Sequence, residues 1–446
     1  MELVADLHLH SKYSRAVSPQ MEIAQMVQWA RVKGINLLGT GDFTHPIWFR
    51  DLRVKLEERD GILSLKGKTN KKEGRVGFVL TTEISSVYSV LGRTRKVHNL
   101  ILAPSFASVE KINKELESQG ICLISDGRPT VGLSARNLLE LVMEIDENCL
   151  VIPAHAWTPW FSIYGSKAGF DSITECFGSS SKYIYAVETG LSSDPGMNWQ
   201  IEELDTRSIV SFSDAHSLAN LGREVTVFET DDHKYKTEKF KYSDIAGAIK
   251  KEKSSFRISN TLEFYPQEGK YHYTGHRKCG VIQSPWQTAK KGTVCPVCGK
   301  PLTVGVMERV AKLGRSAQIE VLEQKDELGV RWFLKKGRPK YATLVPLAEI
   351  VAEVYKVGDS SRKVMSEYER LINSLGTEHE ILTKINIDEI SKAAGEKLAE
   401  GIARVRAGEI NIEPGYDGQY GRIKIWNDKE KDERKKEPKT EQGALF

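Results

Sequence analysis

Between residues 1 and 262, apolar runs of strand length alternate with amphipathic helical patterns. The first run leads from Val4 to Leu9, and a helical pattern from Met21 to Lys33 follows a Ser18-Pro19 pair, a typical helix start. Further runs at 36–40, 76–81, 97–103, 150–154, 185–188 and 209–213 bring the predicted strands to seven. This alternation predicts a parallel α/β barrel, in which chemistry collects at the C-terminal ends of the strands.

Histidine and carboxylate residues stand at the ends of these predicted strands. His8 and His10 follow the first strand, whose period of two turns both imidazoles to one side while Leu7 and Leu9 pack on the other. Later strands end or begin with further candidates of this kind, namely Asp42, His45, Glu83, His98, His155, Asp214 and His216. Any one could be structural, but a convergent set is hard to explain by packing and indicates a metal centre.

The donor set limits the metals that such a centre would hold. Mixed nitrogen and oxygen ligation suits Zn²⁺, Mn²⁺ or Fe²⁺ better than Mg²⁺ or Ca²⁺, which prefer oxygen ligands alone. Up to nine ligands predict two or three divalent ions, with zinc, manganese and magnesium as the candidates. Such ions activate a water for in-line attack at phosphorus, so no side-chain nucleophile is needed.

These motifs resemble the polymerase and histidinol phosphatase (PHP) domain. The resemblance rests on the His-x-His start, the Thr-Gly-Asp segment, Glu83, His98, His155 and Ser213-Asp214-Ala215-His216, and it spans residues 1–262. It implies a distorted seven-stranded α/β barrel with a trinuclear metal centre that hydrolyses phosphoesters. Many members of the family have Asp-His at the second motif, whereas here Phe43 follows Asp42, so either Asp42 or His45 is expected to supply that ligand.

Three of these residues are the catalytic candidates. Glu83 would bridge two ions, while Asp214 and His216 would complete the ligand shell and assist protonation of the leaving group.

A second metal-binding pattern follows the barrel, within a region that we assign to residues 263–345. His276 and Cys279 form an HxxC knuckle and Cys295 and Cys298 a CxxC knuckle, separated by 15 residues. This spacing can close one tetrahedral, structural zinc site. His272 is the rival fourth ligand, and a redox pair or plain buried thiols is the alternative. Zinc modules bind either nucleic acid or protein, and the spacing does not choose between them.

Basic and aromatic residues mark candidate DNA contacts. Arg331, Lys335 and Lys336 lie among aromatic residues in a stretch suited to a nucleic-acid backbone and a stacked base, although an ordinary solvated strand and turn has the same pattern. Trp157 and Trp160 directly follow His155 and are candidates for stacking on nucleic acid, or for a lid packed on the barrel.

Residues 346–426 read as a mainly helical region. Within it, 387–408 roughly follows the second half of a helix-hairpin-helix, with Gly395 at the turn and Arg404 downstream. The first glycine of that motif is missing, so an ordinary helical hairpin is equally open. A glycine- and tyrosine-rich loop at 414–421 precedes a final strand at 422–426.

The last segment, 427–446, is charged and ends in an apolar pair. We expect a disordered tail there. Its end resembles a sliding-clamp-binding peptide, in which Gln442 would fill one pocket and Leu445 with Phe446 another.

Composition changes this picture little. The 446 residues, 40% of them hydrophobic, suffice for two or three domains with real cores. No apolar run reaches the about 18 residues of a membrane helix, and the chain starts on a strand rather than a signal segment, so we expect a cytoplasmic protein without a membrane partner. The net charge of +4 is too small to prove a nucleic-acid partner, but the basic clusters lie in the second half.

Taken together, the barrel, the zinc knuckles and the helical region with its Pro-Gly-Tyr-Asp-Gly loop resemble the endonuclease Q family over nearly the whole chain. The resemblance implies a metal-dependent DNA repair endonuclease that cuts 5′ to deaminated bases (hypoxanthine, uracil and xanthine) and to abasic sites. Three alternatives stay open. They are a small-molecule phosphatase of the same barrel family, a non-catalytic DNA- or clamp-binding scaffold, and a nuclease of different specificity.

Overall fold

Seven strands close a distorted barrel at the centre of the computed structural model, which describes residues 1–67, 76–236, 240–315 and 319–427. They are β1 (Glu2–Asp6), β2 (Leu37–Gly39), β5 (Gly77–Val90), β6 (Arg93–Ala103), β8 (Leu150–Pro153), β9 (Ala186–Glu188) and β10 (Ser208–Val210). A backbone hydrogen bond from Ala156 N to Glu188 O links the segment after β8 to β9, and a bridge between Leu9 and Ala215 links the segments after β1 and β10, which completes the ring. All seven predicted strands are present, and the predicted α/β class is confirmed.

One strand runs against the others, so the barrel is not wholly parallel as expected. β1, β2 and β5 pair in parallel, as do β9 and β10, but β6 is antiparallel to both β5 and β8. The cause is a two-residue turn at Leu91 and Gly92, both with positive φ, which joins β5 directly to β6 as a hairpin. The start of β6, rather than its end, therefore lies at the edge where the other strands finish.

An apolar core fills the barrel and supports the polar edge above it. It takes side chains from every strand of the ring, including Leu3, Ala5, Leu37, Val79, Leu100, Ile152, Ala186 and Val210. A second core lies outside the ring, under α1 (Ile23–Lys33), α2 (Pro46–Lys55), α3 (Phe106–Ser118), α4 (Ala135–Ile145) and α5 (Ile173–Phe177). α6 (Pro195–Asn198) and α7 (Tyr242–Lys250) complete the cover, together with the short strands β3 (Leu56–Arg59), β4 (Ile62–Leu65) and β7 (Thr130–Val131).

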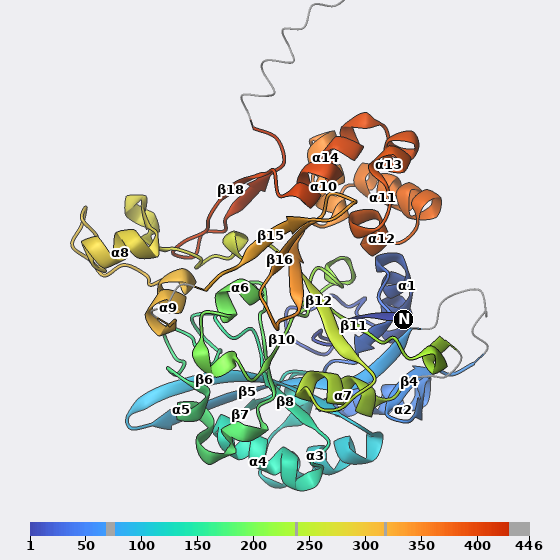
Figure 1. Cartoon of the computed structure of the whole chain (residues 1–446). Coiled ribbons are helices and arrows are strands. Elements are labelled where there is room, and N and C mark those ends of the chain that lie inside the picture. Colours follow the sequence, from blue (N-terminus) through green and yellow to red (C-terminus); the bar gives the residue numbers. More distant parts are fainter. Residues whose placement is uncertain (68–75, 237–239, 316–318, 428–446) are drawn as a thin grey trace, which may run out of the picture.

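The sheet continues beyond the ring towards the C-terminal half (Figure 1). β1 pairs with β11 (Val225–Glu229), followed by β12 (Arg257–Glu263), β17 (Lys340–Thr343), β16 (Arg331–Leu334) and β15 (Leu322–Lys325). The basic strands that we grouped with the zinc module thus extend the sheet of the barrel. The module itself holds β13 (Thr274–His276), β14 (Val281–Gln283), α8 (Pro285–Lys291) and α9 (Val306–Leu313), and Figure 1 shows it projecting to one side.

Five helices gather at the far end of the extended sheet: α10 (Leu347–Tyr355), α11 (Arg362–Leu375), α12 (Glu378–Thr383), α13 (Ile387–Ala394) and α14 (Glu396–Ala407). The hairpin predicted at 387–408 is α13 and α14, turning at Gly395. A short ribbon of β18 (Asn411–Glu413) and β19 (Arg422–Lys424) follows. A buried ion pair of Lys33 Nζ with Glu378 Oε2, at 2.7 Å, fastens α12 to α1. Among the described residues, none of the helices is sufficiently long and apolar to span a bilayer.

Candidate metal centre

The predicted strand-end residues converge at one edge of the barrel. Their ligand atoms form three overlapping groups, each within 4.8 Å: His8, His10 and Glu83; His10, Asp214 and His216; Glu83, His98 and His155. Shared members join the groups into one cluster, as three neighbouring ions would require. Seven of the nine predicted ligands are therefore brought together.

Glu83 stands at the centre of the cluster. Its Oε1 lies 2.6 Å from His98 Nδ1 and 3.0 Å from His155 Nε2, and its Oε2 lies 3.6 Å from His10 Nε2. Glu83 and His98 meet because β5 and β6 pair antiparallel, which places both side chains on one face of the hairpin. This position between groups fits the bridging role predicted for Glu83.

The Nδ1 atom of each of the first two histidines contacts a carboxylate outside the ligand groups. His8 Nδ1 lies 2.9 Å from Glu188 Oε1, and His10 Nδ1 lies 3.0 Å from Asp42 Oδ1. Carboxylates on the outer nitrogen of a metal-binding imidazole fix its tautomer and orientation. Glu188 also accepts a hydrogen bond from His155 N at 2.8 Å. We did not predict Glu188, although it ends the sixth predicted strand and the same strand-end signal would have found it.

Asp42 and His45 lie outside the three ligand groups. The second carboxylate oxygen of Asp42 accepts from Ser11 N, Ser11 Oγ and Ser14 Oγ, so Asp42 supports His10 from behind. His45 caps α2, where its Nδ1 accepts from Trp48 N, and its ring stacks on Tyr13 at 4.4 Å. The departure from the Asp-His motif thus coincides with two side chains that lie outside the ligand groups.

The backbone at the centre is constrained. Asp42, His155 and Asp214 have φ values of 50°, 31° and 48°, in the left-handed region that side-chain-bearing residues seldom occupy. Such conformations cluster at functional sites, where the fold holds them against their cost. At His155 and Asp214 they occur shortly after β8 and β10, at residues whose side chains belong to the ligand groups.

The donor atoms fit divalent cations. His8 Nε2 is buried and has no hydrogen-bond partner among the described residues, yet it lies 3.8 Å from both Glu83 Oε1 and Asp214 Oδ1. Although burial opposes charge, the surrounding histidines hold the pKa of Glu83 and of Asp214 well below the usual range. Ionised carboxylates beside an imidazole nitrogen without a partner make a ligand set for zinc or manganese.

Access to the centre is from one side. His8, His10 and Glu83 are fully buried, whereas the side chains of Asp214 and His216 are 24% and 31% exposed. Arg128 lies at this open side, with its Nη1 3.2 Å from Glu83 Oε2. Sequence reasoning missed Arg128 because it stands in a loop rather than at a strand end.

The two predicted zinc knuckles also meet. The ligand atoms of His276, Cys279, Cys295 and Cys298 lie within 4.8 Å of one another. Although desolvation opposes it, hydrogen bonds from His276 and the backbone lower the pKa of Cys295 to about 6, which favours the thiolate that zinc binds. His272 is buried outside this group, so His276 is the fourth member.

The remaining candidates are scattered. Trp157 is buried and donates to Asn198 Oδ1, as the packing alternative requires, whereas Trp160 is 39% exposed. Arg331, Lys335 and Lys336 lie on or after β16, and Arg404 bonds Glu400 on α14. Gly395, at φ 84°, has open space where a Cβ would be. Gln442, Leu445 and Phe446 lie outside the described residues.

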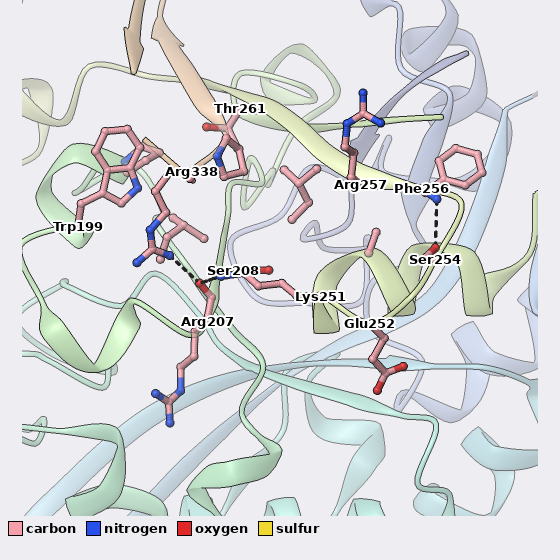
Figure 2. Close-up of a pocket in the computed structure, with 16 residues that line it drawn as sticks. Trp199, Arg207, Ser208, Lys251, Glu252, Ser254, Phe256, Arg257, Thr261 and Arg338 are labelled. Carbon is pink, nitrogen blue, oxygen red and sulfur yellow. Dashed lines mark hydrogen bonds between the residues drawn. The ribbon is translucent and has the colours of Figure 1, made fainter. Parts of the chain in front are cut away.

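A cavity of about 350 Å³ lies away from the metal centre, around the start of β10 (Figure 2). Its lining includes Trp199, Ser208, Lys251, Arg257 and Arg338. The basic groups are engaged within the protein: Lys251 Nζ and Arg338 Nη1 both donate to Arg207 O, and Arg338 also pairs with Asp205. None of the predicted site residues lines this cavity.

Comparison with known proteins decides the family. The crystal structure of the lesion-specific endonuclease PfuEndoQ from Pyrococcus furiosus matches with a TM-score of 0.79 and 31% identity, covering 95% of this chain and 96% of that one. The chain belongs to the endonuclease Q family. A crystal structure of endonuclease Q with a 27-mer duplex carrying an abasic lesion at its active site matches equally well, at TM-score 0.79 and 31% identity over 96% and 98% of the two chains.

Sequence relatives agree with this placement. The uncharacterized protein YqxK of Bacillus subtilis is 29% identical over 439 residues, 95% of this endonuclease Q family chain and 99% of the relative. The uncharacterized protein MJ0043 of Methanocaldococcus jannaschii is 36% identical over 271 residues, which are 60% of this chain but 31% of that protein. A family model described as the MJ0043 C-terminal domain matches residues 346–409, which hold the five C-terminal helices.

Proposed function

We propose that this protein is a metal-dependent DNA endonuclease that hydrolyses the phosphodiester 5′ to deaminated bases (hypoxanthine, uracil and xanthine) and to abasic sites. The observation that carries the proposal is the cluster of three overlapping ligand groups in a chain that matches lesion-specific endonucleases along almost its whole length. A phosphatase of the same barrel type would need the cluster but not the zinc module, and a scaffold would not need the cluster.

The residues of the centre would divide the work. Bound divalent ions would supply a water of lowered pKa and stabilise the charge that develops at phosphorus. His8, His10 and Glu83, which are buried, would hold them, with Glu188 and Asp42 fixing the two imidazoles. Buried positions suit this task because the ligands cannot swing away from the site.

The substrate phosphate would enter at the open side. Arg128 would donate to a phosphate oxygen, because its guanidinium already faces the cluster and is partly exposed. His216 Nδ1 donates to Asp214 O at 2.8 Å, and one nitrogen of its ring lies within 4.8 Å of the ligand atoms of His10 and Asp214. Asp214 and His216 would ligate an ion and pass a proton to the leaving oxygen.

A nicking assay tests the proposal. End-labelled duplexes differing by a single deoxyinosine, deoxyuridine, deoxyxanthosine or abasic site would be incubated with Mg²⁺, Mn²⁺ or Zn²⁺. We expect a metal-dependent nick 5′ of the lesion, absent from the undamaged duplex and from an Asp214→Asn variant that keeps its fold. Hydrolysis of phosphomonoesters without nicking would identify a phosphatase instead, and cleavage at ends alone a different nuclease.

The end of the chain adds a partner to the proposal. Gln442, Leu445 and Phe446 have the pattern of a sliding-clamp-binding peptide, so we assign this tail to clamp binding. Removing residues 442–446 should abolish retention of the protein on an immobilised clamp. The nicking rate measured without the clamp should stay unchanged. Equal retention of the truncated protein would remove the clamp from the proposal.

A further inference from the structure

Three partly exposed aromatic side chains come from distant parts of the chain; two of them are in contact, and the loop of the third approaches this pair. Trp160 follows β8, Tyr271 precedes the zinc knuckles, and Tyr420 belongs to the loop at 414–421. The rings of Trp160 and Tyr271 are 5.3 Å apart at 73°, and Tyr271 Oη lies 3.7 Å from where a Cβ of Gly418 would be. Trp160 and Tyr420 are 39% and 66% exposed, so both side chains keep surface that solvent or a ligand can reach.

This group of aromatic residues reaches the metal centre through Phe161. The ring of Phe161 packs on the imidazole of His98 at 4.7 Å, and Phe161 O accepts from His98 N at 3.0 Å. Trp160 is therefore one residue away from a direct contact with a member of the cluster.

The loop that presents Tyr420 is held firmly against the segment before the zinc knuckles. Its glycines donate from Gly415 N to Gln267 O, from Gly418 N to Lys270 O and from Gly421 N to Glu268 O. A Cβ on Gly415 would lie 2.3 Å from Gly269 O and one on Gly421 2.2 Å from Gln267 O, so this close approach requires glycine. The exposed tyrosine is thus displayed by a fixed loop.

Positive charge accompanies the rings. Lys270 Nζ lies 4.5 Å from the centre of the Tyr420 ring, and Lys96 Nζ lies 5.0 Å from that of Phe161. Aromatic faces next to basic groups are what single-stranded DNA binds, because each base offers a flat face for stacking and each linkage a negative charge. A purely apolar protein partner would gain nothing from the two lysines.

We infer that Trp160, Tyr271 and Tyr420 form a surface on which bases of an unpaired DNA strand stack on their way to the metal centre. The inference rests on the proposed function and adds to it the surface that holds the DNA strand around the lesion. It also gives the glycine- and tyrosine-rich loop a role that the sequence alone did not assign.

Binding to an undamaged, fluorescently labelled single-stranded oligonucleotide tests the surface without cleavage. Trp160→Leu and Tyr420→Leu should each weaken binding about 5- to 150-fold, the range expected for loss of one stacked base, whereas Trp160→Phe and Tyr420→Phe should bind nearly as wild type. Tyr355→Leu is the matched control, because the Tyr355 ring also has a lysine beside it, with Lys363 Nζ at 4.1 Å, but lies at the end of α10 and outside this group of aromatic residues.

Kinetics on a lesion-containing strand separate the possible failures. Trp160→Leu and Tyr420→Leu should each raise KM and leave kcat nearly unchanged. Unaltered oligonucleotide binding, or a loss of kcat that phenylalanine does not rescue, would overturn the stacking surface while wild-type nicking still upheld the proposed function. A wild-type protein that binds the strand through these rings but never nicks would refute the proposed function alone.

Discussion

Replacement of Glu188 by glutamine tests whether the carboxylate behind His8 controls metal binding. Both oxygens of Glu188 lie within 3.0 Å of His8 Nδ1, and one accepts from His155 N at 2.8 Å. Glutamine keeps the size of the side chain but removes its charge and offers an amide N–H towards His8. The substitution therefore alters contacts of two members of the cluster, His8 and His155, while every proposed ligand stays in place.

The expected loss follows from these contacts. Removing a carboxylate that supports a metal-bound histidine typically costs 10- to 100-fold in metal affinity, or about 1.4–2.7 kcal/mol. We expect Glu188→Gln to lie in the upper part of that range, because it disturbs both His8 and the backbone of His155. Excess metal should restore much of the activity, since the ligands themselves are intact.

The assay is a Mn²⁺ titration of the nicking rate, with calorimetry for the binding constant and thermal unfolding as a check of the fold. Glu203→Gln is the matched control, because that carboxylate also makes two kinds of hydrogen bond, from Tyr164 Oη and Ile173 N, but away from the cluster. A Mn²⁺ affinity of Glu188→Gln within twofold of wild type would show that the pairing with His8 plays no part in metal binding.

Three further predictions concern the zinc module, pH and the contact between barrel and helices. Cys298→Ser should lower the zinc content measured by atomic absorption by one ion per chain, whereas Cys122→Ser, outside the cluster, should not. Burial raises the pKa of Glu263 from 4.5 to about 8, so the folded state keeps a proton that the unfolded chain loses. Between these pH values the contribution of Glu263 to stability should fall by up to about 1.4 kcal/mol per pH unit as pH rises. In urea unfolding, Glu263→Gln should flatten the dependence of stability on pH, and an unchanged slope would contradict this prediction. Lys33→Met should cost about 3–5 kcal/mol of unfolding free energy, because it leaves the buried Glu378 carboxylate without its counter-ion. Adding Glu378→Gln to this variant should recover part of the loss. Equal stability of the single and double variants would refute this account.

Much of the centre could be read from the sequence because local periodicity encodes it. Apolar runs marked all seven barrel strands, and the period of two placed His8 and His10 on one side. The spacing of the HxxC and CxxC knuckles likewise identified a group that the fold brings together within 4.8 Å. The segment 387–408 forms two helices that meet at Gly395, and the sequence had left open whether this is a helix-hairpin-helix or an ordinary helical hairpin.

Tertiary structure decided which carboxylates face the metals and which support them. His8 and Glu188 are 180 residues apart, and only closure of the ring through β9 brings them into contact. Asp42 and His45 looked like ligands because they follow a strand, but the left-handed turn at Asp42 sends its side chain behind His10. Strand ends are visible in a sequence, whereas the direction of a side chain after the strand depends on backbone angles that neighbouring strands impose.

The same reason explains why Trp160 and Tyr271 meet, because no local pattern links their two segments. The direction of β6, in contrast, follows from the short turn at Leu91 and Gly92, which the sequence analysis did not identify. The sequence by itself determined the elements and the chemistry that they carry. The closed barrel and the packing of the 414–421 loop decided which of those groups meet, because such meetings depend on distances through space rather than along the chain.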